Sequence, residues 1–184
     1  MAGLPQGYTL RLAEERDIPQ LVVIELESNE LFRPLGLIPE ENMEDHVSID
    51  YHRGSIADET SFVVSDDTGT AVGFALCSER DPDLYLDEVS VHPDHGRKGI
   101  GRALVERVIE EARQREKPSV SLSTFRDVVW NAPFYATLGF REITEDDWED
   151  WMHDFNRIQA ETLDVSKRCF MRRSFRKGLF RRGG

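Results

Sequence analysis

Alternating apolar and polar residues predict a series of short strands separated by turns and helices. The first is YTLRLA at residues 8–13, where apolar and polar side chains alternate over most of the run. Farther along, DDTG at 66–69 is a turn-forming sequence that joins two apolar runs into a hairpin. The predicted strands are residues 8–13, 61–66, 70–79, 84–91, 119–125, 140–144 and 165–175.

Apolar residues three or four positions apart predict the helices between these strands. The strongest pattern covers residues 99–117 and ends at Pro118. Its apolar stripe consists of Gly101, Leu104, Val105, Val108, Ile109 and Ala112. A second helix over 16–33 carries Glu25 and Asn29 on an otherwise apolar face, and weaker helical patterns follow. These weaker patterns cover residues 39–50, 131–138 and 145–164.

Helices and strands mixed along one chain of ordinary length predict a single α/β domain. The 184 residues are 39% hydrophobic and 32% charged, which is typical of a globular protein. No run approaches the about 18 consecutive apolar residues of a membrane helix, and the first residues lack a signal-peptide layout. Cys77 and Cys169 form no CxxC pair or zinc spacing. We therefore expect a reduced, cytoplasmic protein with no metal site and no membrane partner.

The net charge of −12 is distributed unevenly along the chain. Residues 167–184 carry eight basic side chains and no acidic one, so the other 15 of the 23 basic residues face all 35 acidic ones. Residues 1–166 thus have a net charge of −20, which repels nucleic acid and attracts cations. No nucleic-acid partner is expected. We place the domain over residues 1–175 and predict a flexible basic tail over 176–184.

The sequence HPDHGRKGIG at 92–101 lies between a predicted strand and the long helix. Glycine lets a backbone approach a ligand closely, and the first amides of a helix are unpaired donors at the positive end of its dipole. Such a loop binds phosphate groups, and Arg97, Lys98 and Arg102 add local positive charge. The glycine spacing fits neither a P-loop nor the dinucleotide-binding GxGxxG. The alternative is a tight turn that uses glycine only for its geometry.

The loop and helix resemble the acyl-CoA-binding signature of the GNAT superfamily of N-acyltransferases. That signature is Gln or Arg, two residues, Gly, one residue, then Gly or Ala. Gly99 and Gly101 match its last two positions, and Gly96 stands where the family has Gln or Arg. The resemblance implies a mainly antiparallel sheet flanked by helices, acetyl-CoA as cosubstrate, and a pantetheine arm paired with the backbone of Val89, Ser90 and Val91. The implied phosphate-binding residues are Gly96, Arg97, Lys98, Gly99, Ile100, Gly101 and Arg102.

A second run, DVVWNAPFYATLGFREI at 127–143, resembles the later Asn-x-x-x-Tyr…Gly-Phe motif of the same family. The resemblance implies that Asn131 and Phe134 contact the CoA arm and that Tyr135 lies near the thioester sulfur. A phenol with a pKa near 10 can donate a proton to a departing thiolate, which makes Tyr135 the candidate general acid. The run is also typical of a short helix capped by Asn131 and Gly139, with a buried tyrosine bonded to backbone.

Glu88 is the first candidate for the base that takes a proton from the attacking amine. An alkyl amine with a pKa of about 10.4 is mostly protonated at pH 7, and deprotonating it costs about 4 kcal/mol. Glu88 lies on the predicted strand just before the loop, and regular alternation puts Asp87 on the opposite face. Asp87 becomes the candidate if the faces are reversed. Histidine side chains in general titrate near neutrality, but His92 and His95 are more typical of turn residues here.

The acceptor pocket is predicted from the first helix and the link that follows it. Glu25 on an apolar face needs a partner, which a cationic amine would supply, as would a buried cap or salt bridge. In the resembling family this region shapes the acceptor pocket, so we predict Glu25, Asn29 and Phe32 as substrate-binding residues. Trp148 and Trp151 either stack on substrate or pack a surface helix.

These observations predict an acetyl-CoA-dependent N-acetyltransferase that acts on a primary amine of a small molecule. No Ser-His-Asp layout is visible and neither cysteine is in a nucleophile context, so direct transfer is expected. The alternatives are acetylation of a protein N-terminus or lysine, and a non-catalytic module that retains CoA. Homodimers are frequent in the resembling family, so a homodimer is an expectation from the resemblance alone.

Overall fold

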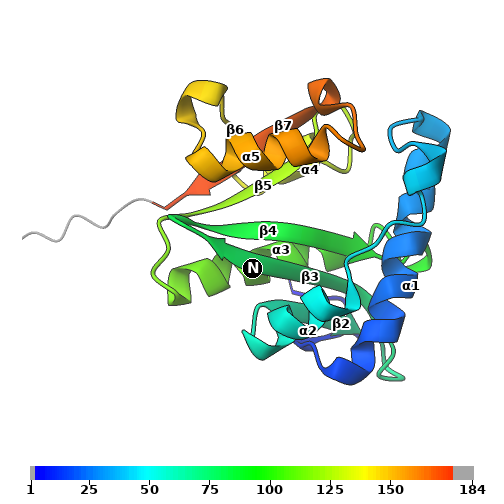
Figure 1. Cartoon of the computed structure of the whole chain (residues 1–184). Helices are drawn as coiled ribbons and strands as arrows, with labels where there is room; N and C mark the ends of the chain where they lie inside the picture. The colour runs from blue at the N-terminus through cyan, green and yellow to red at the C-terminus, as the bar shows by residue number, and fades with distance from the viewer. Residues whose placement is uncertain (1–2, 176–184) are drawn as a thin grey trace, which may run out of the picture.

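A seven-stranded sheet forms the centre of the computed structural model, which describes residues 3–175 (Figure 1). Its strand order is β1-β2-β3-β4-β5-β7-β6, and among the described strands only β4 and β5 pair in parallel. The strands are β1 (Thr9–Leu12), β2 (Ser61–Ser65), β3 (Ala71–Arg80), β4 (Asp83–Val91), β5 (Ser119–Phe125), β6 (Arg141–Glu142) and β7 (Arg168–Ser174). The predicted α/β fold with a mainly antiparallel sheet is confirmed. The tail predicted at 176–184 lies outside the described residues.

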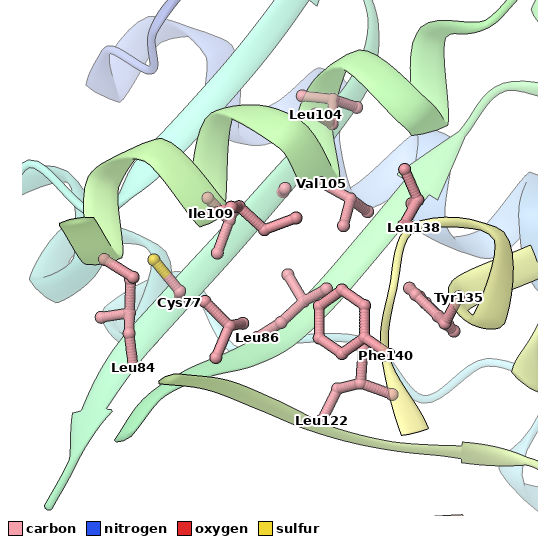
Figure 2. Close-up of a cluster of buried hydrophobic side chains, with 14 of the residues drawn as sticks. Cys77, Leu84, Leu86, Leu104, Val105, Ile109, Leu122, Tyr135, Leu138 and Phe140 are labelled. Atoms are coloured by element: carbon pink, nitrogen blue, oxygen red, sulfur yellow. The ribbon is translucent and has the colours of Figure 1, made fainter. Parts of the chain in front are cut away.

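Helices cover both faces of this sheet. They are α1 (Ile18–Asn29), α2 (Ile49–Ala57), α3 (Ile100–Gln114), α4 (Ala132–Thr137) and α5 (Asp150–Gln159). On one face, Leu104 and Ile109 of α3 lie over Leu84 and Leu86 of β4, as Figure 2 shows. The amphipathic stripe predicted for this helix is the reason, because it buries its apolar residues against the sheet. No helix in residues 3–175 is long and apolar enough to cross a membrane.

The other face of the sheet packs against α1, α2 and α5. Leu21 and Ile24 of α1 lie in one apolar cluster with Phe74 of β3. Met152 of α5 lies in a second apolar cluster, with Tyr85 of β4 and Phe170 of β7. The sheet therefore has two apolar faces, and each candidate site residue on its strands lies on one of them.

A β-bulge interrupts the pairing of β3 with β4. Leu76 pairs with Glu88 and Cys77 pairs with Leu86, so Asp87 is an extra residue on β4. The Asp87 carboxylate accepts a hydrogen bond from Tyr51 of α2, and Glu88 is bonded to Ser90, which reaches α1. Both carboxylates thus lie on the face covered by α1 and α2. The predicted placement of Asp87 on the opposite face is wrong, because an extra residue shifts the alternation by one position.

Strands β4 and β5 pair only near their beginnings. Leu84 pairs with Val120 and Tyr85 with Ser121, and beyond these residues the two strands separate (Figure 1). Residues 86–91 therefore have no strand partner on the β5 side among the described residues. The separation opens the middle of the sheet at the carboxyl ends of two neighbouring parallel strands.

The second helix is not where the sequence pattern places it. Residues 39–50 contain a 3₁₀ turn at Glu40–Asn42, and α2 begins only at Ile49, so the helix predicted over this range is wrong. Ser48 fixes the start of α2, because its hydroxyl accepts a hydrogen bond from the amide of Tyr51 at 3.2 Å. The predicted strand at 165–175 likewise begins later, since Val165–Lys167 form a 3₁₀ turn before β7.

Candidate active site

A cleft of about 1090 Å³ opens where β4 and β5 separate. Its walls come from the second half of β4, the loop before α3, the ends of β5 and α1, and α4. Most of the predicted site residues line it: Asn29, Phe32, Glu88, Val89, Ser90, Val91, Gly96, Arg97, Gly99, Ile100, Gly101, Arg102, Asn131, Phe134 and Tyr135. Two of the predicted site residues, Glu25 and Lys98, do not line the cleft. Segments distant in sequence thus meet in one cavity.

The loop before α3 presents a row of free backbone donors to this cleft. The amides of residues 97–102 donate no hydrogen bond to any described residue, and the first bond of α3 runs from the Ala103 amide to the Gly99 carbonyl at 3.0 Å. Gly99 precedes the helix with φ of +83°, a left-handed conformation that favours glycine. Six unpaired amides at a helix N-terminus suit a phosphate or diphosphate group.

The three basic residues of the loop are placed differently from one another. Arg97 is exposed and lines the cleft, and Arg102 reaches across to α4, where it donates to the Thr137 hydroxyl at 2.9 Å. Lys98 instead donates to the Tyr8 hydroxyl and to the Asp94 carbonyl, both at 3.2 Å. Arg97 and Arg102 are therefore the basic side chains placed to meet an anion, and Lys98 ties the loop to the N-terminal segment.

Glycine at position 73 brings α3 close to the sheet, a role that the sequence pattern does not reveal. A Cβ atom at Gly73 would lie 3.0 Å from Cγ2 of Ile100 and 3.2 Å from the Ser90 carbonyl oxygen. Any other residue would push the first turn of α3 away from β4. Gly73 therefore helps to set the distance between the amide row and the strand beside it.

Tyr135 lies at the inner end of the cleft, between α4 and the core (Figure 2). Its ring packs on Phe134 and Phe140, with centroids 5.2 and 5.8 Å apart. Its hydroxyl makes no hydrogen bond to any described residue, so the alternative of a tyrosine bonded to backbone is not what the structure shows. Burial raises the pKa of Tyr135 and the Glu88 carboxylate raises it further, which keeps the phenol protonated.

Asn131 does not cap α4 with its side chain, as the sequence suggests it can. Its side-chain amide donates to the Thr124 hydroxyl on β5 at 2.8 Å, and its backbone carbonyl accepts the first bond of the helix, from Tyr135. Gly139 ends the α4 region with φ of +86°, as predicted. The Asn131–Thr124 bond anchors α4 to β5 and so holds Tyr135 at the opening between the strands.

Glu88 is half-buried and belongs to a chain of hydroxyl groups. Its Oε1 accepts a hydrogen bond from the Ser90 hydroxyl at 2.8 Å, and the Ser90 and Ser28 hydroxyls lie 3.0 Å apart. Burial raises the pKa of Glu88, and the Ser90 hydrogen bond opposes that rise. A carboxylate with a raised pKa that faces a cleft is suited to take up a proton.

Glu25 departs from the placement that the sequence led us to expect. Its two carboxylate oxygens accept hydrogen bonds from the Val47 amide at 3.1 Å, so a loop within the protein supplies its partner. Burial, with the charge of Glu88, raises its pKa to about 8. Asn29 is also engaged, since its side-chain amide donates to the Asp45 carbonyl at 3.1 Å. Both residues hold the 43–47 loop against α1.

Phe32 lies where the acceptor pocket is expected. It belongs to a 3₁₀ turn after α1 (Glu30–Leu35), and its ring packs 5.4 Å from that of Phe125 and 5.9 Å from that of Trp130. These three aromatic residues form an apolar wall on the β5 side of the cleft. Trp148 and Trp151 pack instead on Phe170 beneath α5 and do not line the cleft.

Asp87, the alternative base, also lines the cleft, but its carboxylate is engaged. Its Oδ1 accepts hydrogen bonds from the Tyr51 hydroxyl at 2.9 Å and the Ser78 hydroxyl at 3.1 Å. Burial raises its pKa to about 6, against the opposing effect of those two bonds. His92 and His95 have the turn roles expected of them: Nδ1 of His92 accepts from the Asp94 amide, and His95 is bonded to the Tyr8 hydroxyl.

Arg168 is a cleft residue that the sequence does not single out. It begins β7 beside Phe125 of β5, and its guanidinium lies 4.6 Å from the centre of that ring. In the sequence it is one of eight bases near the C-terminus, and only the pairing of β7 with β5 brings it to the cleft.

Comparison with known proteins identifies relatives of this chain. The model of the acetyltransferase (GNAT) family matches residues 23–140. An uncharacterized N-acetyltransferase from Methanocaldococcus jannaschii is 32% identical over 108 residues, which are 55% of this chain and 47% of that protein. The ribosomal protein bS18-alanine N-acetyltransferase of Escherichia coli is 32% identical over 76 residues, 41% of this chain and 51% of that protein. The chain thus spans about half the length of these relatives.

A solved structure has the same fold. The PaiA N-acetyltransferase from Thermoplasma acidophilum, in complex with coenzyme A, gives a TM-score of 0.70 over 91% of this chain and 99% of that chain, at 16% identity. Identity this low shows a shared fold alone. The family model, however, covers more than half of the chain and includes the amide row, Glu88 and Tyr135. On this evidence the chain belongs to the acetyltransferase (GNAT) family.

Proposed function

We propose that this protein transfers an acetyl group from acetyl-CoA to a primary amine of a small molecule by direct attack. The observation that carries the proposal is one cleft that holds a row of free amides, the Glu88 carboxylate and an unbonded Tyr135 hydroxyl. These are an anion site, a base and an acid. Acyl transfer from a CoA thioester to an amine needs all three.

The residues present fit acetyl-CoA. The amides of 97–102, with Arg97 and Arg102, suit the diphosphate. Between Val89 and Val91, the backbone groups of β4 that point toward β5 have no strand partner among the described residues, so they are free to pair with an extended amide-bearing arm. Acetyl-CoA, when bound, supplies the acetyl group as a thioester. Asn131 and Phe134 line the same path on the α4 side.

Two proton movements follow from the placement of the side chains. Glu88 accepts a proton from the acceptor ammonium, which leaves the neutral amine to form the new C–N bond as the C–S bond breaks. Tyr135 donates its hydroxyl proton to the departing sulfur. The proton that the new amide nitrogen loses passes to solvent, and solvent returns one proton to the Tyr135 phenolate. The raised pKa of Glu88 lessens the roughly 4 kcal/mol needed to deprotonate an alkyl amine at pH 7, because a more basic carboxylate is a better proton acceptor.

A second candidate function is acetylation of a peptide or protein amine. Exposed apolar side chains beside the cleft favour it, since Trp130, which lines the cleft, is 46% exposed and the preceding Val129 is 76% exposed. One of the relatives acts on ribosomal protein bS18, so its acceptor is a protein. A non-catalytic CoA-binding module is disfavoured, because such a module has no use for the Glu88 and Tyr135 pair.

Thiol release from acetyl-CoA distinguishes these functions. We expect release with a panel of small primary amines, and mass spectrometry should find the N-acetylated amine in amounts equal to the thiol. Release with peptides but with no small amine would instead support the second candidate function. Stoichiometric CoA binding with no release on either panel would contradict acetyl transfer and support the binding module.

A further inference from the structure

Arg168 is a cationic side chain of the cleft that forms no ion pair with any described residue. Arg168 is half-buried, and its Nη2 donates to the carbonyl and hydroxyl of Ser123 at 3.1 and 3.3 Å. Its Nε is buried and makes no hydrogen bond, and no described carboxylate lies within ion-pair distance of its guanidinium. Arginine remains charged in proteins, so this side chain cannot relieve the cost by losing a proton.

Arg172 provides a comparison within the same strand. It lies four residues farther along β7, on the same face, and its guanidinium is paired with Asp83 at 3.0 Å and Glu149 at 3.0 Å. The fold thus neutralises one half-buried arginine of β7 and leaves the other unpaired at the cleft. An unpaired buried cation that faces a cleft points to an anionic ligand.

Arg168 lies on the same face of the sheet as Glu88, the proposed base. Arg168 is bonded to Ser123, whose hydroxyl donates to Gln159 of α5, and α5 packs on the same side of the sheet as α1 and α2. Glu88 lies on that side as well, through Ser90 and Ser28. The row of free amides is at the start of α3, which packs on the opposite face of the sheet. Glu88 and Arg168 therefore lie on the same face of the sheet, the face on which the proposed acceptor binds.

We propose that Arg168 binds a carboxylate of the acceptor, so that the small molecule acetylated in this cleft is an amino acid. This inference rests on the proposed function, because it assigns the acceptor of the same site. The ammonium group lies toward Glu88 and the carboxylate toward Arg168 and Ser123. Phe32, Phe125 and Trp130 form the apolar wall beside them and favour an apolar or aromatic side chain.

A matched pair of acceptors tests the proposal, namely L-phenylalanine and L-phenylalaninamide, which differ only in the carboxylate. We expect kcat/KM for the acid to fall at least tenfold relative to the amide in Arg168→Gln, because a charge-assisted hydrogen bond is lost. Comparing the acid-to-amide ratio between enzymes cancels the difference in amine pKa. Arg168→Lys keeps the charge and should restore part of the ratio, and Arg141→Gln, at an exposed position of β6, should leave it unchanged.

Two results would overturn the proposal. One is an equal loss of activity on both acceptors in Arg168→Gln, which would mean that Arg168 acts on Glu88 or on the fold. The other is a wild-type ratio in that variant. If no amine is acetylated at all, the proposed function fails, and binding still tests Arg168. N-acetyl-L-phenylalanine, with CoA present, should then raise the Tm of the wild type more than its amide does, and should not do so in Arg168→Gln; equal shifts would overturn the assignment.

Discussion

Replacing Ser90 by alanine removes the hydrogen bond that opposes the rise in the pKa of Glu88. The Ser90 hydroxyl donates to Glu88 Oε1 at 2.8 Å, and a hydrogen bond to a charged group contributes about 1.5–3 kcal/mol. One pKa unit corresponds to about 1.4 kcal/mol, so the full loss is about 1–2 units. Because water can replace part of the bond at a half-buried carboxylate, we expect an upward shift of about one unit.

The pH dependence of turnover reports this shift. A carboxylate with a higher pKa stays protonated to a higher pH and cannot accept a proton there, so the acid limb of kcat/KM for acetyl-CoA should move upward by about one pH unit. Saturating acceptor keeps the ionisation of the free amine out of this profile. Ser90→Thr retains the hydroxyl and serves as the control. An acid limb in Ser90→Ala that coincides with that of the wild type, or that moves downward, would refute the assignment of Glu88 as the base.

Three further predictions concern the row of free amides before α3 and the stability of the fold. Gly99→Ala should weaken CoA binding, because a side chain at φ of +83° strains the backbone by about 1 kcal/mol or more. Gly69→Ala, at φ of +84° in the β2–β3 turn, is the control: it should destabilise the fold by a similar amount but leave the Kd for CoA, measured by calorimetry, unchanged. His52 is fully buried with both ring nitrogens unbonded, and burial lowers its pKa, so its own contribution to the free energy of unfolding should be constant above about pH 6.5 and fall below it by up to about 1.4 kcal/mol per pH unit. The carboxyls with raised pKa values, Glu25 above all, give the opposite slope, so the measurement is the difference between urea titrations of the wild type and His52→Gln over this pH range. A difference that does not change with pH contradicts the prediction. Arg172→Gln should lower the free energy of unfolding by about 3–5 kcal/mol, since it leaves Asp83, which is 0% exposed, as an unpaired buried charge, and a loss below about 1 kcal/mol would rule this out.

The part of the site that could be predicted from the sequence is the part that local motifs determine. The free amides before α3 and the position of Tyr135 after Asn131 depend on residues close together in the chain, on a glycine in a left-handed conformation and on a short helix. Strand β4 leads directly into that loop, so Glu88 also falls near the cleft.

The remainder depends on contacts between distant segments. Asp87 shares a face with Glu88 because β4 holds one residue more than β3 at their pairing, which no pattern within β4 reveals. Glu25 finds its partner in the Val47 amide, on a loop whose course follows from the late start of α2. Arg168 reaches the cleft only through the pairing of β7 with β5. Alternation and helical periodicity describe single segments, so they cannot predict these three placements.

Turnover and cofactor affinity of Tyr135→Phe together test the central claim most directly, that the acetyl group moves at this cleft with Tyr135 as the acid. The substitution removes only the hydroxyl, which makes no hydrogen bond to the described residues, so the packing of the ring on Phe134 and Phe140 is retained. General acid catalysis contributes about 10²-fold or more, so kcat for thiol release should fall about 100-fold while the Kd for CoA stays within about twofold of the wild type. Turnover equal to that of the wild type, with CoA bound as tightly, would contradict the account.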